Sequence, residues 1–156
     1  MRKRLLSLLL VCVMLAGILP CAVADSGTDP ADVVILLDRS DNMNEEFRSQ
    51  ALHSSTYVRK MRPARSLAQS VIDAVLSGND SSRVAIVAFD KEAAVARTFS
   101  KSRTLLKSTV TTILRSSEKA NVEAALLAAT DLLQTEGRSG VKQAVVLISA
   151  GKAQYY

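Results

Sequence analysis

Three runs of apolar residues have the pattern of strands that are buried on both faces. They cover residues 32–38, 83–89 and 143–149. Each run is rich in valine, isoleucine and leucine and is bounded by polar residues, which is typical of central strands in a parallel sheet. A shorter, more polar run at 94–99 follows the second one after a tight connection at 90–92. This spacing predicts an antiparallel hairpin whose second strand lies at the margin of the sheet.

Between these strands the apolar residues recur with a helical period, which predicts three helices. The first begins near Pro63, a residue that suits the first turn of a helix, and ends before Gly78. The second follows Ser102 and the third follows Asn121, and both residues are of types that cap helices. The predicted apolar faces are Leu67, Val71, Ala74 and Val75 in the first helix, Leu106, Val110, Ile113 and Leu114 in the second, and Val122, Ala125, Leu126, Ala129 and Leu133 in the third.

The order of these elements predicts an α/β fold. Strand, helix, strand, edge strand, helix, helix and strand make a doubly wound, mostly parallel sheet with one antiparallel edge strand and helices on both faces. The stretch 44–62 does not belong to this scheme. Its apolar residues Phe47, Ala51, Val58 and Met61 share a helical face, which predicts an extra helix or a structured loop. The alternative is a surface excursion without a partner.

The first 24 residues have the composition of a secretory signal peptide. Basic residues at 2–4 precede an almost uninterrupted apolar run at 5–19, and small residues at Ala22 and Ala24 predict cleavage after Ala24. The apolar run is shorter than the roughly 20 residues that a membrane-spanning helix needs. A lipid anchor on Cys21 is the weaker alternative, because Pro20 stands where a small residue should precede the modified cysteine. We therefore expect a secreted or otherwise extracytoplasmic protein, at the cell surface or in the periplasm, with membrane contact only through an uncleaved leader.

Charge and cysteine content change this picture little. Three of the 20 lysines and arginines lie in the leader, which leaves 17 against 15 acidic residues. No basic and aromatic residues alternate as in nucleic-acid-binding motifs, so we expect no nucleic-acid partner. Cys12 and Cys21 both lie in the leader, so the mature chain has no cysteine for a disulfide or a thiolate metal site. His53 is the only histidine, which favours a solvated or packing role over metal binding or acid-base chemistry.

The first predicted strand ends in a dense group of oxygen donors. Asp38, Ser40 and Asn42 place a carboxylate, a hydroxyl and an amide at alternate positions of a short loop. Such donors suit a hard divalent cation, since Mg²⁺ and Ca²⁺ prefer oxygen ligands. Open α/β sheets also bind ligands beyond the carboxyl ends of their strands. The alternative is a turn in which Asp38 accepts hydrogen bonds from nearby backbone amides.

The segments 32–43, 83–90, 120–126 and 145–151 together resemble the von Willebrand factor type A (vWA) domain family, over about residues 32–151. The resemblance implies a Rossmann-like fold and a protein-binding or adhesion function. In that family an Asp-x-Ser-x-Ser loop, a threonine and a later aspartate form a metal-ion-dependent adhesion site, and the metal takes a carboxylate from the partner protein.

The match to this site is incomplete. Asp38 and Ser40 fall on the first aspartate and serine of the family motif, and Asn42 stands at the second serine. Ala120 stands in the place of the threonine and Ala150 in the place of the aspartate. Because the affinity for a hard cation follows the number of carboxylates, the resemblance implies weak binding of Mg²⁺ or Ca²⁺, or none.

The length of the chain is a further departure. The family continues past the fourth strand with further strand and helix units, so we expect a partial domain at 32–156 in which the C-terminal strands are missing. A linker at 25–31 precedes this domain, and 44–62 is an insertion in it. Residues 145–148 would then lie at an exposed edge of the sheet, which another chain could complete.

The leading hypothesis is therefore an exported protein-binding module. An enzyme is less well supported, because no Gly-x-Gly-x-x-Gly, phosphate-binding loop or nucleophile elbow follows any predicted strand. A degenerate or truncated remnant without activity is the third alternative, and the missing ligands and strands favour it.

Overall fold

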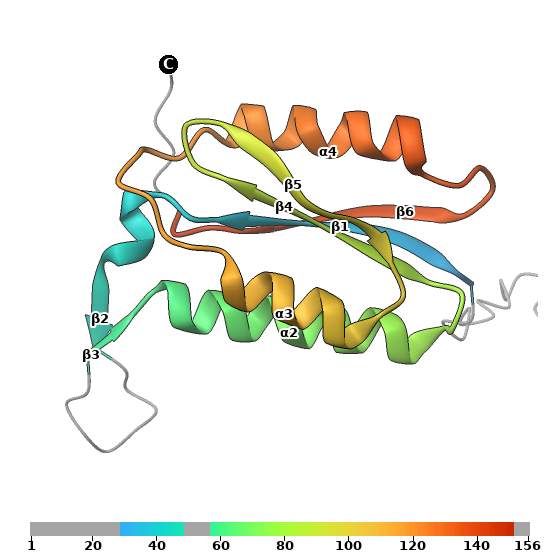
Figure 1. Ribbon diagram of the computed structural model, residues 1–156, viewed down its shortest axis with the longest axis horizontal. Coiled ribbons are helices and arrows are strands. Elements are labelled where there is room, and N and C mark those ends of the chain that lie inside the picture. The colour runs from blue at the N-terminus through green and yellow to red at the C-terminus, as the bar shows by residue number, and fades with distance from the viewer. Residues whose placement is uncertain (1–28, 49–56, 152–156) are drawn as a thin grey trace, which may run out of the picture.

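A four-stranded sheet forms the centre of the computed structural model, which describes residues 29–48 and 57–151 (Figure 1). Its strands follow one another in the order β5-β4-β1-β6. The bounds are Ala31–Asp38 for β1, Arg83–Phe89 for β4, Ala93–Ser100 for β5 and Lys142–Ile148 for β6. β1 pairs in parallel with β4 and β6, whereas β5 pairs antiparallel with β4 at the margin. The predicted mostly parallel α/β sheet with one antiparallel edge strand is confirmed.

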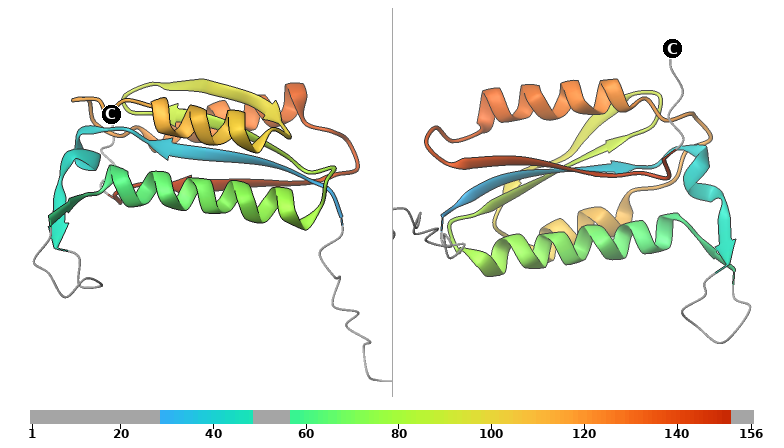
Figure 2. Two further views of the ribbon diagram at one scale, coloured as in Figure 1. Left: turned by 60° about the horizontal axis from the view of Figure 1, so that its bottom comes forward. Right: turned by 180° about the vertical axis from the view of Figure 1, so that it is seen from behind.

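Helices cover both faces of this sheet (Figures 1 and 2). α2 (Met61–Gly78) and α3 (Arg103–Thr112) lie on one face, and α4 (Val122–Glu136) lies on the other. Two of the predicted helix caps are confirmed. The Ser102 side chain accepts a hydrogen bond from the backbone N–H of Leu105 at 3.3 Å, and the Asn121 side chain accepts one from that of Ala124 at 3.0 Å.

The sheet separates two hydrophobic cores, and β1 contributes to both. Val33, Ile35 and Leu37 pack toward α2 and α3, whereas Val34 and Leu36 pack toward α4. None of these five side chains is more than 5% exposed. β1 is therefore buried on both faces, as its continuous apolar run predicted.

The buried faces of the helices differ in part from the predicted ones. The buried residues of α2 are Met61, Ala64, Ala68, Ile72 and Leu76, one position away from the predicted face, and Leu67 is 53% exposed. Two adjacent faces of this helix carry apolar residues, and the face with two alanines packs on the sheet. Leu114 lies beyond the end of α3, and Leu126 is 46% exposed on α4.

Of the two structures predicted for 44–62, an extra helix or a structured loop, the described residues before α2 do not show the extra helix. A short 3₁₀ turn, η1 (Asp41–Asn44), leads into an antiparallel ribbon of β2 (Glu46–Arg48) and β3 (Tyr57–Arg59). Phe47 pairs with Val58 in this ribbon, and Met61 belongs to α2. Aromatic and β-branched residues favour such cross-strand pairs over a helix. Ala51 and His53 lie outside the described residues.

β6 forms one edge of the described sheet, where the sequence placed residues 145–148. The prediction that this run is buried on both faces is wrong, because Val145 is 39% and Leu147 is 45% exposed. α4 contacts β1, β4 and β5, and these two side chains remain uncovered in the described part of the chain. Completion of the sheet by another chain stays a prediction. In the described ranges no helix combines the length and the hydropathy that crossing a membrane requires.

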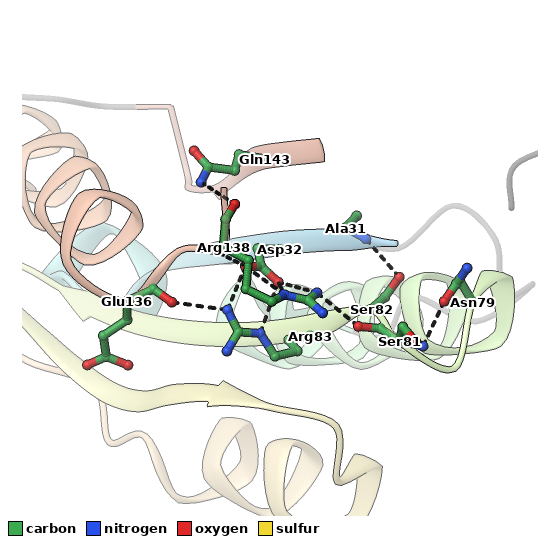
Figure 3. A network of polar contacts seen from close by, with 9 residues as sticks. All are labelled: Ala31, Asp32, Asn79, Ser81, Ser82, Arg83, Glu136, Arg138 and Gln143. Atoms are coloured by element: carbon green, nitrogen blue, oxygen red, sulfur yellow. Dashed lines mark hydrogen bonds and ion pairs between the residues drawn. The ribbon is translucent and has the colours of Figure 1, made fainter. Parts of the chain in front are cut away.

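A buried ion-pair network closes the amino end of the sheet (Figure 3). The Asp32 side chain is fully buried and pairs with the guanidinium groups of Arg83 and Arg138, each with a shortest N–O distance of 2.6 Å. The backbone N–H of Arg138 donates a further hydrogen bond to Asp32 at 2.9 Å. Burial raises the pKa of Asp32, but the hydrogen bonds and charge of the two arginines outweigh it and hold the pKa well below its usual range. The network joins β1 and β4 to the segment between α4 and β6.

Candidate functional site

Asp38 lies at the carboxyl end of β1, and its carboxylate is satisfied from within the chain. One oxygen accepts a hydrogen bond from the backbone N–H of Ser40 at 2.8 Å. The other accepts from the Ser149 hydroxyl at 2.7 Å and from the backbone N–H of Ala150 at 3.4 Å. Asp38 therefore makes the turn bond that the sequence left open as an alternative, and it also ties the loop after β1 to the loop after β6.

All three residues of the candidate loop are buried. Asp38 and Ser40 have no exposed surface, and Asn42 is 8% exposed within η1. The Ser40 Oγ atom has no hydrogen-bond partner among the described residues. Ala120 is fully buried and packs in the core beneath α4. The structure thus brings Asp38, Ser40 and Ala150 together. The role of Asp38, Ser40 and Asn42 as metal ligands stays a prediction.

Two ion pairs connect the loop after β1 to its neighbours. Arg39 pairs with Asp90 of the β4–β5 turn at 2.7 Å, and Lys119 pairs with Asp41 at 2.5 Å. A backbone hydrogen bond of 2.8 Å from Asp41 to Glu118 parallels the second pair. Three loops that are distant in sequence are therefore held together at the carboxyl ends of β1 and β4.

The Asp90 carboxylate is held in place by hydrogen bonds from three residues. Burial raises its pKa, but hydrogen bonds from the Glu92 backbone, from Ser116 and from Arg39, together with the Arg39 charge, lower it below its ordinary value. Asp90 therefore stays ionised and keeps Arg39 positioned at physiological pH.

Comparison with known proteins identifies the fold family. A model of the von Willebrand factor type A domain matches residues 33–152. The chain belongs to this family. A sequence search of curated proteins found no significant match.

Solved structures share the fold of this vWA domain at low sequence identity. The vWF domain of the type V pili tip protein Mfa5 from Porphyromonas gingivalis is 22% identical, with a TM-score of 0.64 over 81% of this chain and 39% of that chain. The PilB minor pilin from Streptococcus sanguinis is 17% identical, with a TM-score of 0.64 over 77% and 29%. An aerotolerance-related membrane protein from Bacteroides fragilis is 20% identical, with a TM-score of 0.61 over 81% and 57%. The chain spans less than two thirds of each of these proteins.

Weak or absent binding of a hard cation by this vWA domain stays a prediction, and it concerns the oxygen donors of the loop after β1. Asp38 supplies one carboxylate, which already accepts three hydrogen bonds, and Ser40 supplies a buried hydroxyl without a partner among the described residues. Ala120 and Ala150 add no side-chain oxygen. Within residues 29–48 and 57–151, no three His, Cys, Asp or Glu side chains gather as a metal site. The Asp38 carboxylate, the Ser40 hydroxyl and the Asn42 amide are the donors on which the prediction of a weakly held cation, or none, rests.

The structure also places four arginines around a cavity beside this loop, which the sequence analysis missed. Arg59, Arg62, Arg65 and Arg115 line a cavity of about 780 Å³. Arg59, Arg62 and Arg65 follow one another at intervals of three residues, from the end of β3 into the first turns of α2, and this spacing was a signal in the sequence. Arg115 joins them only because the segment after α3 folds back beside α2.

Proposed function

We propose that this chain is an extracytoplasmic protein-binding module of the adhesion type, with weak or no dependence on divalent cations. Domains of the vWA family commonly bind proteins. The observation that carries the cation independence is the internal satisfaction of Asp38 by Ser40, Ser149 and Ala150. Asp38, which stands at the first aspartate of the family's adhesion motif, instead connects the loop after β1 to the loop after β6 through these hydrogen bonds.

The similar solved structures and the leader support an extracellular role. Mfa5 is described as a pili tip protein and PilB as a minor pilin, so both are parts of surface appendages. The apolar leader with small residues before Asp25 favours export of this chain. A catalytic role is disfavoured, because the only histidine has no evident serine and carboxylate partners in the sequence.

The alternative is a remnant of a vWA domain that binds nothing. Alanine at both 120 and 150 and the exposed apolar residues of β6 favour it. The two hypotheses differ in a measurable way, because only the binding module retains a specific partner.

Adding EDTA to the purified chain is expected to leave its melting temperature unchanged. A ligand stabilises a fold in proportion to the logarithm of its concentration over its dissociation constant, and the donor set of Asp38 and Ser40 predicts a weak site. Differential scanning fluorimetry checks this. The Ala150→Asp variant is the positive control, since it returns a carboxylate to the family's position and should gain stability with Mg²⁺ or Ca²⁺. A large drop for the wild type on adding EDTA, reversed by either cation, contradicts the proposal.

The immobilised mature chain is expected to capture the same partner from surface-protein extracts in Mg²⁺ and in EDTA. Mass spectrometry identifies the partner, and binding is then measured with the purified partner. Lys119→Ala should weaken this binding, because it breaks the ion pair with Asp41 that connects the loop after β1 to the segment before α4. Lys107→Ala is the matched control, since it breaks a comparably exposed pair with Asp73 on the helices. Capture that disappears in EDTA contradicts cation independence, and no specific capture under either condition favours the remnant.

A further inference from the structure

The arginine pocket is the cavity lined by Arg59, Arg62, Arg65 and Arg115. It lies between η1, β3, the start of α2 and the segment that follows α3. Ser116, one of its lining residues, donates its backbone N–H to the carbonyl of Arg39 at 2.7 Å, so the pocket borders the loop after β1. None of the described residues that line the pocket is acidic.

Much of the positive charge of the arginine pocket is not neutralised. Arg59 lies 3.5 Å from Glu46 across the ribbon, and both side chains are at least half exposed, so this pair is weak. The guanidinium groups of Arg62 and Arg115 have no ion pair or hydrogen bond to any described residue. The described part of the chain therefore leaves at least two guanidinium groups for an external anion.

Two further features of the pocket indicate a missing acceptor. Arg65 is held in place by a 2.5 Å hydrogen bond to the carbonyl of Ile113, yet its Nε–H is buried and has no acceptor in the described part of the chain. α2 begins here without an acidic residue in its first turn and without a side-chain cap. The partial positive charge of an uncapped helix start adds to that of the arginines.

The size and lining of the pocket select the class of anion. A volume of about 780 Å³ is larger than one phosphate needs. The arginines come from β3, from α2 and from the segment after α3, and this spread suits a row of carboxylates. Guanidinium groups bind carboxylates through paired hydrogen bonds. Among the described lining residues there is no aromatic side chain to stack a nucleotide base. Leu114 and Met61 are the apolar ones among them, which is little for insertion into a membrane.

We propose that the arginine pocket binds an acidic segment of the protein partner, an inference that rests on the proposed function. In the vWA family a metal takes the carboxylate of the partner. Here the arginines supply positive charge next to a loop whose own carboxylate is satisfied internally.

Fluorescence anisotropy with a labelled oligoglutamate peptide tests the pocket on the mature chain. The Arg62→Gln/Arg115→Gln variant should bind the peptide at least about tenfold more weakly than the wild type, because it removes two charged donors. The Lys101→Gln/Arg103→Gln variant is the matched control. It removes two positive charges at the start of α3, at the opposite end of the sheet, and should bind as the wild type does (Figure 1). Equal melting temperatures confirm that all three proteins are folded.

Three outcomes overturn the arginine pocket as a site for acidic protein segments. They are equal affinity of all three proteins for oligoglutamate, full displacement of the peptide by an equal concentration of inorganic phosphate, and tighter binding of a thymidine oligonucleotide than of oligoglutamate. With the captured partner, loss of binding in the Arg62→Gln/Arg115→Gln variant alone supports the proposal. Unchanged capture by that variant refutes the pocket and leaves the protein-binding function standing. Failure of the wild type to capture any partner refutes the proposed function instead.

Discussion

Replacing Asp32 with asparagine is expected to lower the free energy of unfolding by about 3 kcal/mol. The carboxylate is fully buried and shared by Arg83 and Arg138, so its removal leaves two guanidinium groups without their anion. The two arginines also donate to the backbone carbonyls of Ser81 and Glu136, so the loss loosens the connections of three segments. Chemical denaturation at neutral pH measures the change.

The pH dependence of this difference provides a second check. The pKa of Asp32 is lower in the folded protein than in the unfolded chain, where it is about 3.9. The stability contributed by the ionised carboxylate is therefore fully present above that value and is lost as the pH falls through the folded pKa. The gap between wild type and Asp32→Asn should be constant at neutral pH and narrow in acid. Asp73→Asn, which breaks a surface pair with Lys107, is the control and should cost less than about 1 kcal/mol. Equal losses of unfolding free energy in Asp32→Asn and Asp73→Asn would contradict the prediction that the buried pair is the stronger one.

Replacing Phe89 with alanine is expected to lower the free energy of unfolding by about 3–5 kcal/mol. Phe89 is fully buried at the end of β4, in the core beneath α4 that also contains Ala120. Its backbone carbonyl accepts a hydrogen bond from the backbone N–H of Arg39 at 2.8 Å, so the cavity left by the substitution would lie next to the loop after β1. The midpoint of urea denaturation should fall without a change in slope.

Leu126→Ala is the control for this prediction. Leu126 belongs to α4, above the same core, but is 46% exposed, so its truncation should cost about 1 kcal/mol or less. A loss for Phe89→Ala as small as that expected for Leu126→Ala would contradict the prediction.

The sequence predicts the strands well because their signals are local. β1 and β4 are continuous apolar runs, and Ser102 and Asn121 cap their helices through neighbouring amides. The face that α2 buries depends on the surface it meets, and both faces near Leu67 carry apolar residues. The ribbon of β2 and β3 depends on pairing between two short segments, so a helical period in one of them is misleading.

The sequence names the residues of the candidate site but not their environment. It predicts that Asp38 and Ser40 lie on one loop at the end of β1. It does not predict that Ser149 and Ala150, more than a hundred residues further on, satisfy the Asp38 carboxylate. The arginine pocket was missed for the same reason, since Arg115 reaches the start of α2 only through the tertiary fold.

β1 lies between β4 and β6, and this position determines how the loop after β1 would respond to tension from a bound partner. β1 is hydrogen-bonded to a strand on each side and covered on both faces, so its backbone amides should exchange with deuterium only through global unfolding. The loop after β1 is therefore attached to the strand whose hydrogen bonds should open most slowly. Tension from a bound partner would act in shear on the hydrogen bonds that join β1 to β4 and to β6. All of these bonds would share the force before the loop could separate from the sheet.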